Sequence, residues 1–228
     1  MDEKALLAGY ESLGNALLDL DREKRVGLPE AVFGAGKSVE DLVRIAATFL
    51  EKKKNLLITK LDEAKITAVK KAHPSLHLSR RAGMMWMRFE KPAAPRRPLA
   101  ILSAGTSDGP IFLEAVLTAV FLGNRVIAFS DVGVAGLHRL VSRLPKIREA
   151  SLIIAVAGME GALATVVSGL TGKAVVAVPT SVGYGAGSGG IAPLLTMLAS
   201  CSPTVSVVNI DNGFGAACLA TVLNRQMN

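Results

Sequence analysis

The spacing of apolar residues in the first ninety positions predicts a small unit of helices and strands. An amphipathic helix is expected over residues 3–20, because apolar side chains recur there every three or four positions. Its apolar face would consist of Leu6, Tyr10, Leu13, Leu17 and Leu20. A polar loop interrupted by proline and glycine follows.

A second helix is expected to begin at Ser38, because Ser38 and Asp41 form a capping-box pattern before an apolar run. The residues expected to face the core are Leu42, Ile45, Ala46 and Phe49. The apolar run 56–60, a helix near 62–72 and two strands, around His77 and over 84–89, complete this predicted α/β unit.

The pattern becomes regular after residue 98. Five short apolar runs, 99–103, 125–129, 152–156, 174–178 and 205–210, alternate with segments long enough for helices. Strands that are apolar on both faces indicate a parallel sheet covered on both sides. We therefore predict a three-layer, doubly wound α/β domain over 98–228 and a smaller N-terminal α/β domain over 1–92. The proline-containing segment 91–98 separates them, since proline resists both helix and sheet.

Composition and charge limit the classes of function. The 228 residues are 50% apolar with no run that suggests a membrane span, and the acidic N-terminus does not resemble a signal peptide. The net charge is +7, with 19 Lys+Arg against 13 Asp+Glu up to Pro98 and 7 against 6 beyond it. No aromatic stacking pattern accompanies this charge, so we expect a solvated surface and no nucleic-acid partner. Two cysteines, without metal-site spacing, fit a cytoplasmic protein without membrane contact.

Each predicted strand of the second domain ends in a loop of small or polar residues. In parallel doubly wound sheets such loops meet at the carboxyl edge, where ligands bind. The first loop, 103–110, leads from a strand into a helix with Pro110 near its start. Ser107 or Asp108 could simply cap that helix; alternatively, Thr106 and Ser107 join free amides in an anion site, with Asp108 facing a ribose hydroxyl, a metal or water.

The fourth loop carries glycine at 183, 185, 187, 189 and 190, which indicates close approach of backbone to another group. It is not a dinucleotide fingerprint, because it follows the fourth predicted strand instead of the first. Tyr184 could form a wall for a planar ring or could only pack.

Three further residues are candidates for catalysis or support. Glu160 and Asp131 lie at predicted strand ends, where each could act as a general base, favour a helix N-terminus or cap a turn. His138 is expected on a helix, where packing or indirect support suits it better than direct chemistry.

Cys201 precedes the fifth strand and is therefore expected at the amino edge of the sheet, opposite the loops. It could be a packing residue, as we expect for Cys218. Alternatively, the apolar helix before it, around 190–200, is buried against a neighbouring subunit and carries Cys201 into that subunit's pocket. The second interpretation predicts a homo-oligomer with shared active sites.

Six ordered motifs together resemble one family. They are SAGTSDGP, DVGVAGLHR, AGMEGA, VPTSVGYGAGSGG, the ASC segment at Cys201 and VVNIDNGFGAA, with RVGLPEAVFGAGK in the first domain. This set is similar to the LarB family, the carboxylases of nickel-pincer cofactor biosynthesis, whose second domain resembles the PurE-like aminoimidazole ribonucleotide carboxylases. One departure is GPIFLEA, which lacks a second acidic residue near Glu114.

The resemblance implies a flavodoxin/Rossmann-like, PurE-like fold, a homo-oligomer such as an octamer, and a specific reaction. Nicotinic acid adenine dinucleotide would be carboxylated by CO2 at pyridinium C5 and its phosphoanhydride hydrolysed, giving AMP and the dicarboxylated mononucleotide. Cys201 would be the nucleophile and Glu160 or Asp131 the base, with Asp108 a further catalytic candidate. No tightly bound cofactor is expected, with Mg²⁺ a candidate aid to hydrolysis, although the sequence has no metal-binding pattern. The substrate-binding candidates are Gly105, Thr106, Ser107, Gly133, His138, Gly158, Met159, Ser181, Gly183, Tyr184, Gly185, Asn209, Asp211, Asn212 and Gly213.

Two alternatives stay open. A purine-pathway carboxylase or mutase would act on aminoimidazole ribonucleotide and would need no cysteine nucleophile. A non-catalytic regulatory module would bind a nucleotide unchanged.

Overall fold

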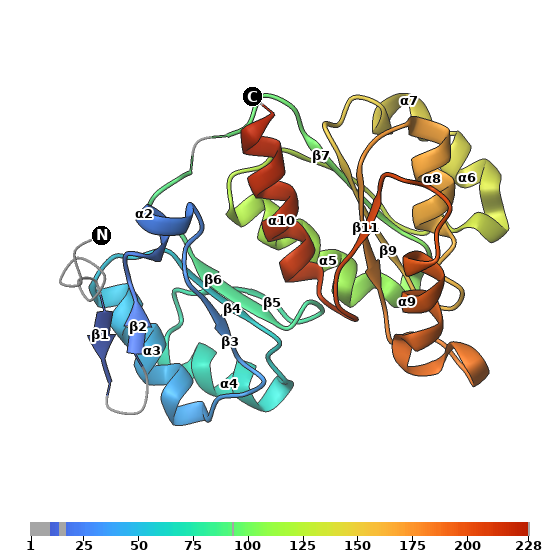
Figure 1. Ribbon diagram of the computed structural model, residues 1–228. Helices are drawn as coiled ribbons and strands as arrows, with labels where there is room; N and C mark the ends of the chain where they lie inside the picture. Colours follow the sequence, from blue (N-terminus) through green and yellow to red (C-terminus); the bar gives the residue numbers. More distant parts are fainter. Residues whose placement is uncertain (1–9, 14–16, 93, 228) are drawn as a thin grey trace. The chain divides into compact units, whose positions relative to one another are not determined.

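The structure is a computed structural model that describes residues 10–13, 17–92 and 94–227 (Figure 1). The chain divides into two compact units between Lys91 and Pro92. No helix within these described ranges is long and apolar enough to cross a membrane.

The first unit contains a four-stranded mixed sheet in the order β3-β4-β6-β5. Its strands are β3 (Ala31–Phe33), β4 (Leu56–Thr59), β5 (His77–Ser79) and β6 (Met84–Met87). Strands β3 and β4 are parallel, whereas β6 runs antiparallel to both β4 and β5. The helices are α2 (Arg22–Val26), α3 (Val39–Glu51) and α4 (Glu63–Ala72).

Two helices of this unit begin where the sequence predicts. The Ser38 hydroxyl oxygen accepts a hydrogen bond from the Asp41 amide at 3.1 Å and caps α3. A carboxylate oxygen of Asp62 accepts from the Lys65 amide at 2.9 Å and caps α4. The four residues expected to face the core from α3 are buried, which confirms the helical spacing.

The predicted helix over 3–20 is wrong for the residues that the structure describes. Two short antiparallel strands, β1 (Tyr10–Ser12) and β2 (Leu17–Asp19), occupy this segment, whereas residues 3–9 and 14–16 lie outside the described residues. Leu18 is buried and Leu17 is exposed, the alternation of a half-buried strand. Apolar spacing in so short a segment fits a helix or a hairpin, and packing decides between them. The following polar loop also contains α2 and β3, which the sequence did not predict.

The second unit is built on a five-stranded parallel sheet in the order β11-β10-β9-β7-β8. Its strands are β7 (Leu99–Ser103), β8 (Val126–Phe129), β9 (Ile153–Ala157), β10 (Val175–Pro179) and β11 (Val205–Val207). The five predicted strands and their parallel pairing are confirmed. The chain enters this sheet at β7 and adds β8 on one side of it. It then crosses back to add β9, β10 and β11 on the other side, so the direction of winding reverses between β7 and β9.

Helices cover both faces of this sheet (Figure 1). One face carries α5 (Gly109–Phe121) and α10 (Gly213–Gln226), which pack against each other. The other carries α6 (Leu137–Val141), α7 (Leu144–Ile147), α8 (Leu163–Thr171) and α9 (Ile191–Leu198). The three-layer, doubly wound α/β fold is therefore confirmed.

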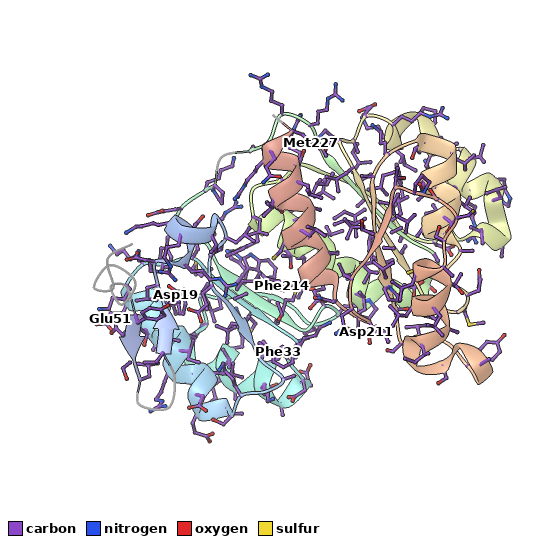
Figure 2. All side chains as sticks on the ribbon, viewed as in Figure 1. Asp19, Phe33, Glu51, Asp211, Phe214 and Met227 are labelled. Atoms are coloured by element: carbon purple, nitrogen blue, oxygen red, sulfur yellow. The ribbon has the colours of Figure 1, made fainter. Side chains whose placement is uncertain are left out.

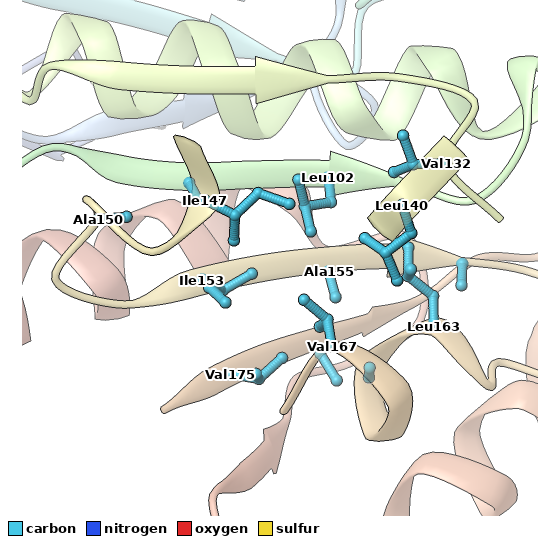
Figure 3. Packing of buried hydrophobic residues seen from close by; sticks show 14 of the residues in the cluster. Leu102, Val132, Leu140, Ile147, Ala150, Ile153, Ala155, Leu163, Val167 and Val175 are labelled. Atoms are coloured by element: carbon cyan, nitrogen blue, oxygen red, sulfur yellow. The ribbon is translucent and has the colours of Figure 1, made fainter. Parts of the chain in front are cut away.

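Alternate residues of each strand supply the two cores. From β7, Leu99 and Ile101 join the core beneath α5 and α10, whereas Ala100 and Leu102 join the core beneath α6 to α9. Figure 3 shows Leu102 in the second of these clusters, near Ile147 and Leu140. A fully buried aliphatic side chain stabilises the fold by about 1.5–3 kcal/mol, so these strand positions hold the loops at the sheet edge in place.

Candidate active site

A cavity of about 510 Å³ lies at the carboxyl edge of the parallel sheet, where the winding reverses. The loops after β7, β8, β9 and β10 all line it, as the topology predicts. Ten of the predicted site residues are among those that line it: Gly105, Ser107, Asp108, Asp131, Gly133, Gly158, Met159, Glu160, Gly183 and Tyr184.

Asp108 joins three of these loops through its carboxylate. One oxygen, Oδ2, accepts from the Gly105 amide at 2.8 Å, and Oδ1 accepts from the Gly158 amide at 3.1 Å and the Thr180 hydroxyl at 2.7 Å. The residue is 4% exposed. A carboxylate with both oxygens engaged by protein donors is suited to hold backbone in position. The amides of Gly105 and Gly158 are also committed to it and are not free to bind an anion.

The floor of the cavity is close-packed backbone. A β-carbon added at Gly158 would lie 2.2 Å from the carbonyl oxygen of Val182, and one at Gly133 would lie 2.8 Å from that of Ala104. Met159, next to Gly158, has a left-handed φ of 54°. Non-glycine residues rarely adopt this conformation, and such strain is characteristic of functional loops.

An ion pair crosses the β8 side of the cavity. Nη1 of Arg139, from α6, donates to Oδ2 of Asp131, and Asp131 has a left-handed φ of 59°. Arg139 lies within the DVGVAGLHR motif, but no role was predicted for it. The sequence feature that could have identified Arg139 is a cationic residue in the first turn of a helix that follows a strand-end loop. Guanidinium groups bind phosphate oxygens in a two-pronged geometry, so Arg139 supplies the cavity with an anion-binding group.

Glu160 and Tyr184 lie at the exposed rim of the cavity. Tyr184 is 78% exposed, and its phenol is available to a ligand. Glu160 is also exposed, and within the described ranges no lysine or arginine forms an ion pair with it. The rim therefore offers a planar ring and an unpaired carboxylate.

The fifth loop does not line this cavity. Asp211 lies at the start of α10, at the opposite end of that helix from Met227 (Figure 2), and its Oδ1 accepts from the Ser181 amide at 2.8 Å. The side-chain oxygen of Asn212 accepts from the Gly215 amide at 2.8 Å and caps α10. The predicted substrate-binding residues that do not line the cavity are Thr106, His138, Ser181, Gly185, Asn209, Asp211, Asn212 and Gly213. The fifth loop thus contacts the glycine-rich loop, through the hydrogen bond between Asp211 and Ser181.

Cys201 is exposed and lies away from the cavity of its own chain. The residues beside it are tied to α8: the Ser200 hydroxyl lies 2.7 Å from that of Thr165, and the Ser202 hydroxyl bonds to that of Ser168. The backbone carbonyl of Thr204 accepts a hydrogen bond from the amide of Val175, which is the first residue of β10. Thr204 therefore lies at the amino edge of the sheet, and Cys201, three residues earlier, lies beside α8 and outside the cavity.

The helix before Cys201 leaves an apolar face uncovered in the single chain. Ile191, Leu195 and Leu198 of α9 are 57%, 59% and 62% exposed, whereas Pro193 and Met197 are buried. The exposed three recur at helical spacing and form one stripe.

In the described part of the chain, no group of three His, Cys, Asp or Glu side chains could hold a metal ion.

Comparison with known proteins assigns both units to families. A LarB/PurE-like N-terminal domain matches residues 10–90, and an AIR carboxylase domain matches residues 99–226. The chain is also 36% identical over 237 residues to uncharacterized protein MJ0165 of Methanocaldococcus jannaschii, covering 100% of this chain and 91% of that protein. The order of the two domains is that of the resemblance found in the sequence. The chain therefore belongs to the LarB family, with a LarB-type N-terminal domain followed by a PurE-like AIR carboxylase domain.

Proposed function

We propose that the protein carboxylates nicotinic acid adenine dinucleotide at pyridinium C5 and hydrolyses its phosphoanhydride, giving pyridinium-3,5-biscarboxylic acid mononucleotide and AMP. The observation that carries this proposal is the exposed Cys201 thiol in a chain of the LarB family. A carboxylase acting on an electron-rich imidazole needs no such thiol, whereas a pyridinium ring does.

The thiolate would overcome the electron deficiency of the ring. Addition of Sγ of Cys201 to a ring carbon converts the pyridinium into a neutral dihydropyridine, whose enamine carbon C5 is nucleophilic. C5 then attacks CO2 and forms the new carbon–carbon bond. Loss of the C5 proton and expulsion of the thiolate restore the aromatic ring, so the cysteine is regenerated.

Glu160 suits the proton-accepting role better than Asp131 does. Asp131 is already paired with Arg139, which satisfies one of its oxygens, whereas Glu160 stands at the cavity rim without an ion pair to any described lysine or arginine. A general base must reach the proton it removes, and an exposed rim carboxylate can approach a ring at the mouth of the cavity. Arg139 and the Ser107 hydroxyl would hold a phosphate.

The position of Cys201 supports a site shared between two subunits. Its separation from its own cavity and the apolar stripe on α9 support a homo-oligomer in which one subunit supplies the thiol and its neighbour supplies the cavity. The exposed stripe provides an apolar surface for that contact.

The test is turnover. The purified protein is incubated with nicotinic acid adenine dinucleotide and labelled bicarbonate, and in parallel with aminoimidazole ribonucleotide. The proposal predicts a labelled pyridinium product and AMP. Consumption of aminoimidazole ribonucleotide alone would assign the protein to purine synthesis, and binding of the dinucleotide without turnover would indicate a regulatory module.

A further inference from the structure

A second cavity lies beside the active-site cavity in the same unit. It measures about 440 Å³ and is lined by the end of β8 and by residues of α6 and the turn after it. Asp131 and Arg139 line both cavities. The two cavities are therefore neighbours that meet at one ion pair.

The side chains of the second cavity suit a planar, anionic ligand. The guanidinium carbon of Arg143 lies over the Phe129 ring, 5.2 Å from its centroid. This layer offers a flat cationic surface on which a nucleobase can stack. Arg139 adds a second cation, and His138 lines the same cavity, whereas Asp131 is the one carboxylate among its lining residues.

The sizes of the cavities bear on the kind of substrate. Pockets for small molecules measure about 300–1,000 Å³, so the first cavity alone is large enough for a mononucleotide. A substrate with two nucleotide halves needs a second space of similar size, joined to the first at a group that binds phosphate. The second cavity and Arg139 meet both requirements.

We propose that the second cavity binds the purine-nucleotide half of a dinucleotide, with the base against the layer formed by Arg143 and Phe129 and the linking phosphates at Arg139. The pyridinium half then occupies the first cavity, an assignment that rests on the proposed function. Phosphate oxygens replace Asp131 as partners of Arg139 when the dinucleotide binds.

Equilibrium binding tests this without turnover. The full-length protein is titrated with AMP, with nicotinic acid mononucleotide and with the dinucleotide, and the titrations are repeated with Arg143→Ala. Loss of a stacking surface weakens binding of a base by about tenfold or more. We expect that loss for AMP and the dinucleotide, with the affinity for the mononucleotide unchanged. Arg148→Ala is the matched control, because Arg148 is an exposed arginine whose side chain donates to the Leu170 carbonyl outside either cavity.

The outcomes separate this inference from the proposed function. Equal affinity of wild type and Arg143→Ala for AMP would overturn the second-cavity assignment even if the protein carboxylates the dinucleotide. Selective loss of AMP binding would uphold it even if no carboxylation is observed. Thermal unfolding of each variant shows whether the fold is intact.

Discussion

The hydroxyl of Thr180 donates to Oδ1 of Asp108 at 2.7 Å, and both residues are buried at the carboxyl edge of the sheet. The bond joins the loop after β7 to the end of β10 across the intervening strand β9. Because Oδ1 also accepts from the Gly158 amide, one carboxylate oxygen aligns all three strand ends.

Asp108→Asn is expected to destabilise the second unit by about 1–3 kcal/mol, because an amide nitrogen would replace an oxygen that now accepts a backbone N–H. Denaturant unfolding measures this change. Unchanged stability of the variant would contradict the role of Asp108 in positioning the loops.

Gly158→Ala is expected to destabilise the unit by about 2 kcal/mol or more, since the new methyl group would lie 2.2 Å from the carbonyl oxygen of Val182. Gly169→Ala is the matched control. Gly169 lies within α8 with no atom within 4 Å of the added carbon, and the substitution there should stabilise by about 0.5–1 kcal/mol. The two changes in unfolding free energy should have opposite signs; the same sign for both would argue against close packing at the cavity floor.

Much of the second unit could be predicted from its sequence, because buried parallel strands are continuous apolar runs and the loop after each must reach the carboxyl edge. Long-range contacts were not predictable. The partners of Asp108 come from residues 50 and 72 positions further along the chain, Gly158 and Thr180, so no local pattern marks them. Arg139 is a different case, because its partner Asp131 lies only eight positions earlier in the chain.

For the fifth loop, the topology predicted the correct edge of the sheet but not the correct contact. Topology places Asp211 at the carboxyl edge, yet β11 is an edge strand, two strands away from the point where the winding reverses. Its loop therefore contacts the glycine-rich loop instead of the cavity.

In the first unit, the segment containing Leu17 and Leu18 forms a strand because its alternation buries one side chain and exposes the next.

Glu30 should give the first unit a distinctive pH dependence. Burial, with the nearby charge of Asp19, raises the pKa of Glu30 above its ordinary value. The folded state then holds the proton more tightly than the unfolded state does, so the stabilisation contributed by Glu30 is present below the ordinary pKa and is lost as pH rises through the raised one.

Glu30→Gln removes this titration. The unfolding free energy of the variant, relative to wild type, should therefore rise as pH is increased from about 4 to 7. Denaturant unfolding of both proteins at several pH values provides the comparison. A difference that stays constant, or that falls with pH, would show that burial does not control this carboxyl group.

Subunit mixing tests the shared site. Cys201→Ala lacks the thiol and Arg139→Ala lacks the phosphate-binding cation, and each variant alone should be strongly impaired. If the two groups come from different subunits, random co-assembly restores about a quarter of the sites. Carboxylation by co-expressed, co-purified variants measures the recovery. A mixture no more active than its components would place both groups in one subunit's site.

The proposed reaction is a cysteine-dependent carboxylation of a pyridinium dinucleotide. Its most direct test is mass spectrometry of the products formed from nicotinic acid adenine dinucleotide and ¹³C-bicarbonate by wild type and by Cys201→Ala. Wild type should give a ¹³C-labelled dicarboxylated mononucleotide and an equal amount of AMP, and the variant should give neither. Labelled product from Cys201→Ala at the wild-type rate, or no labelled product from either protein, would contradict it.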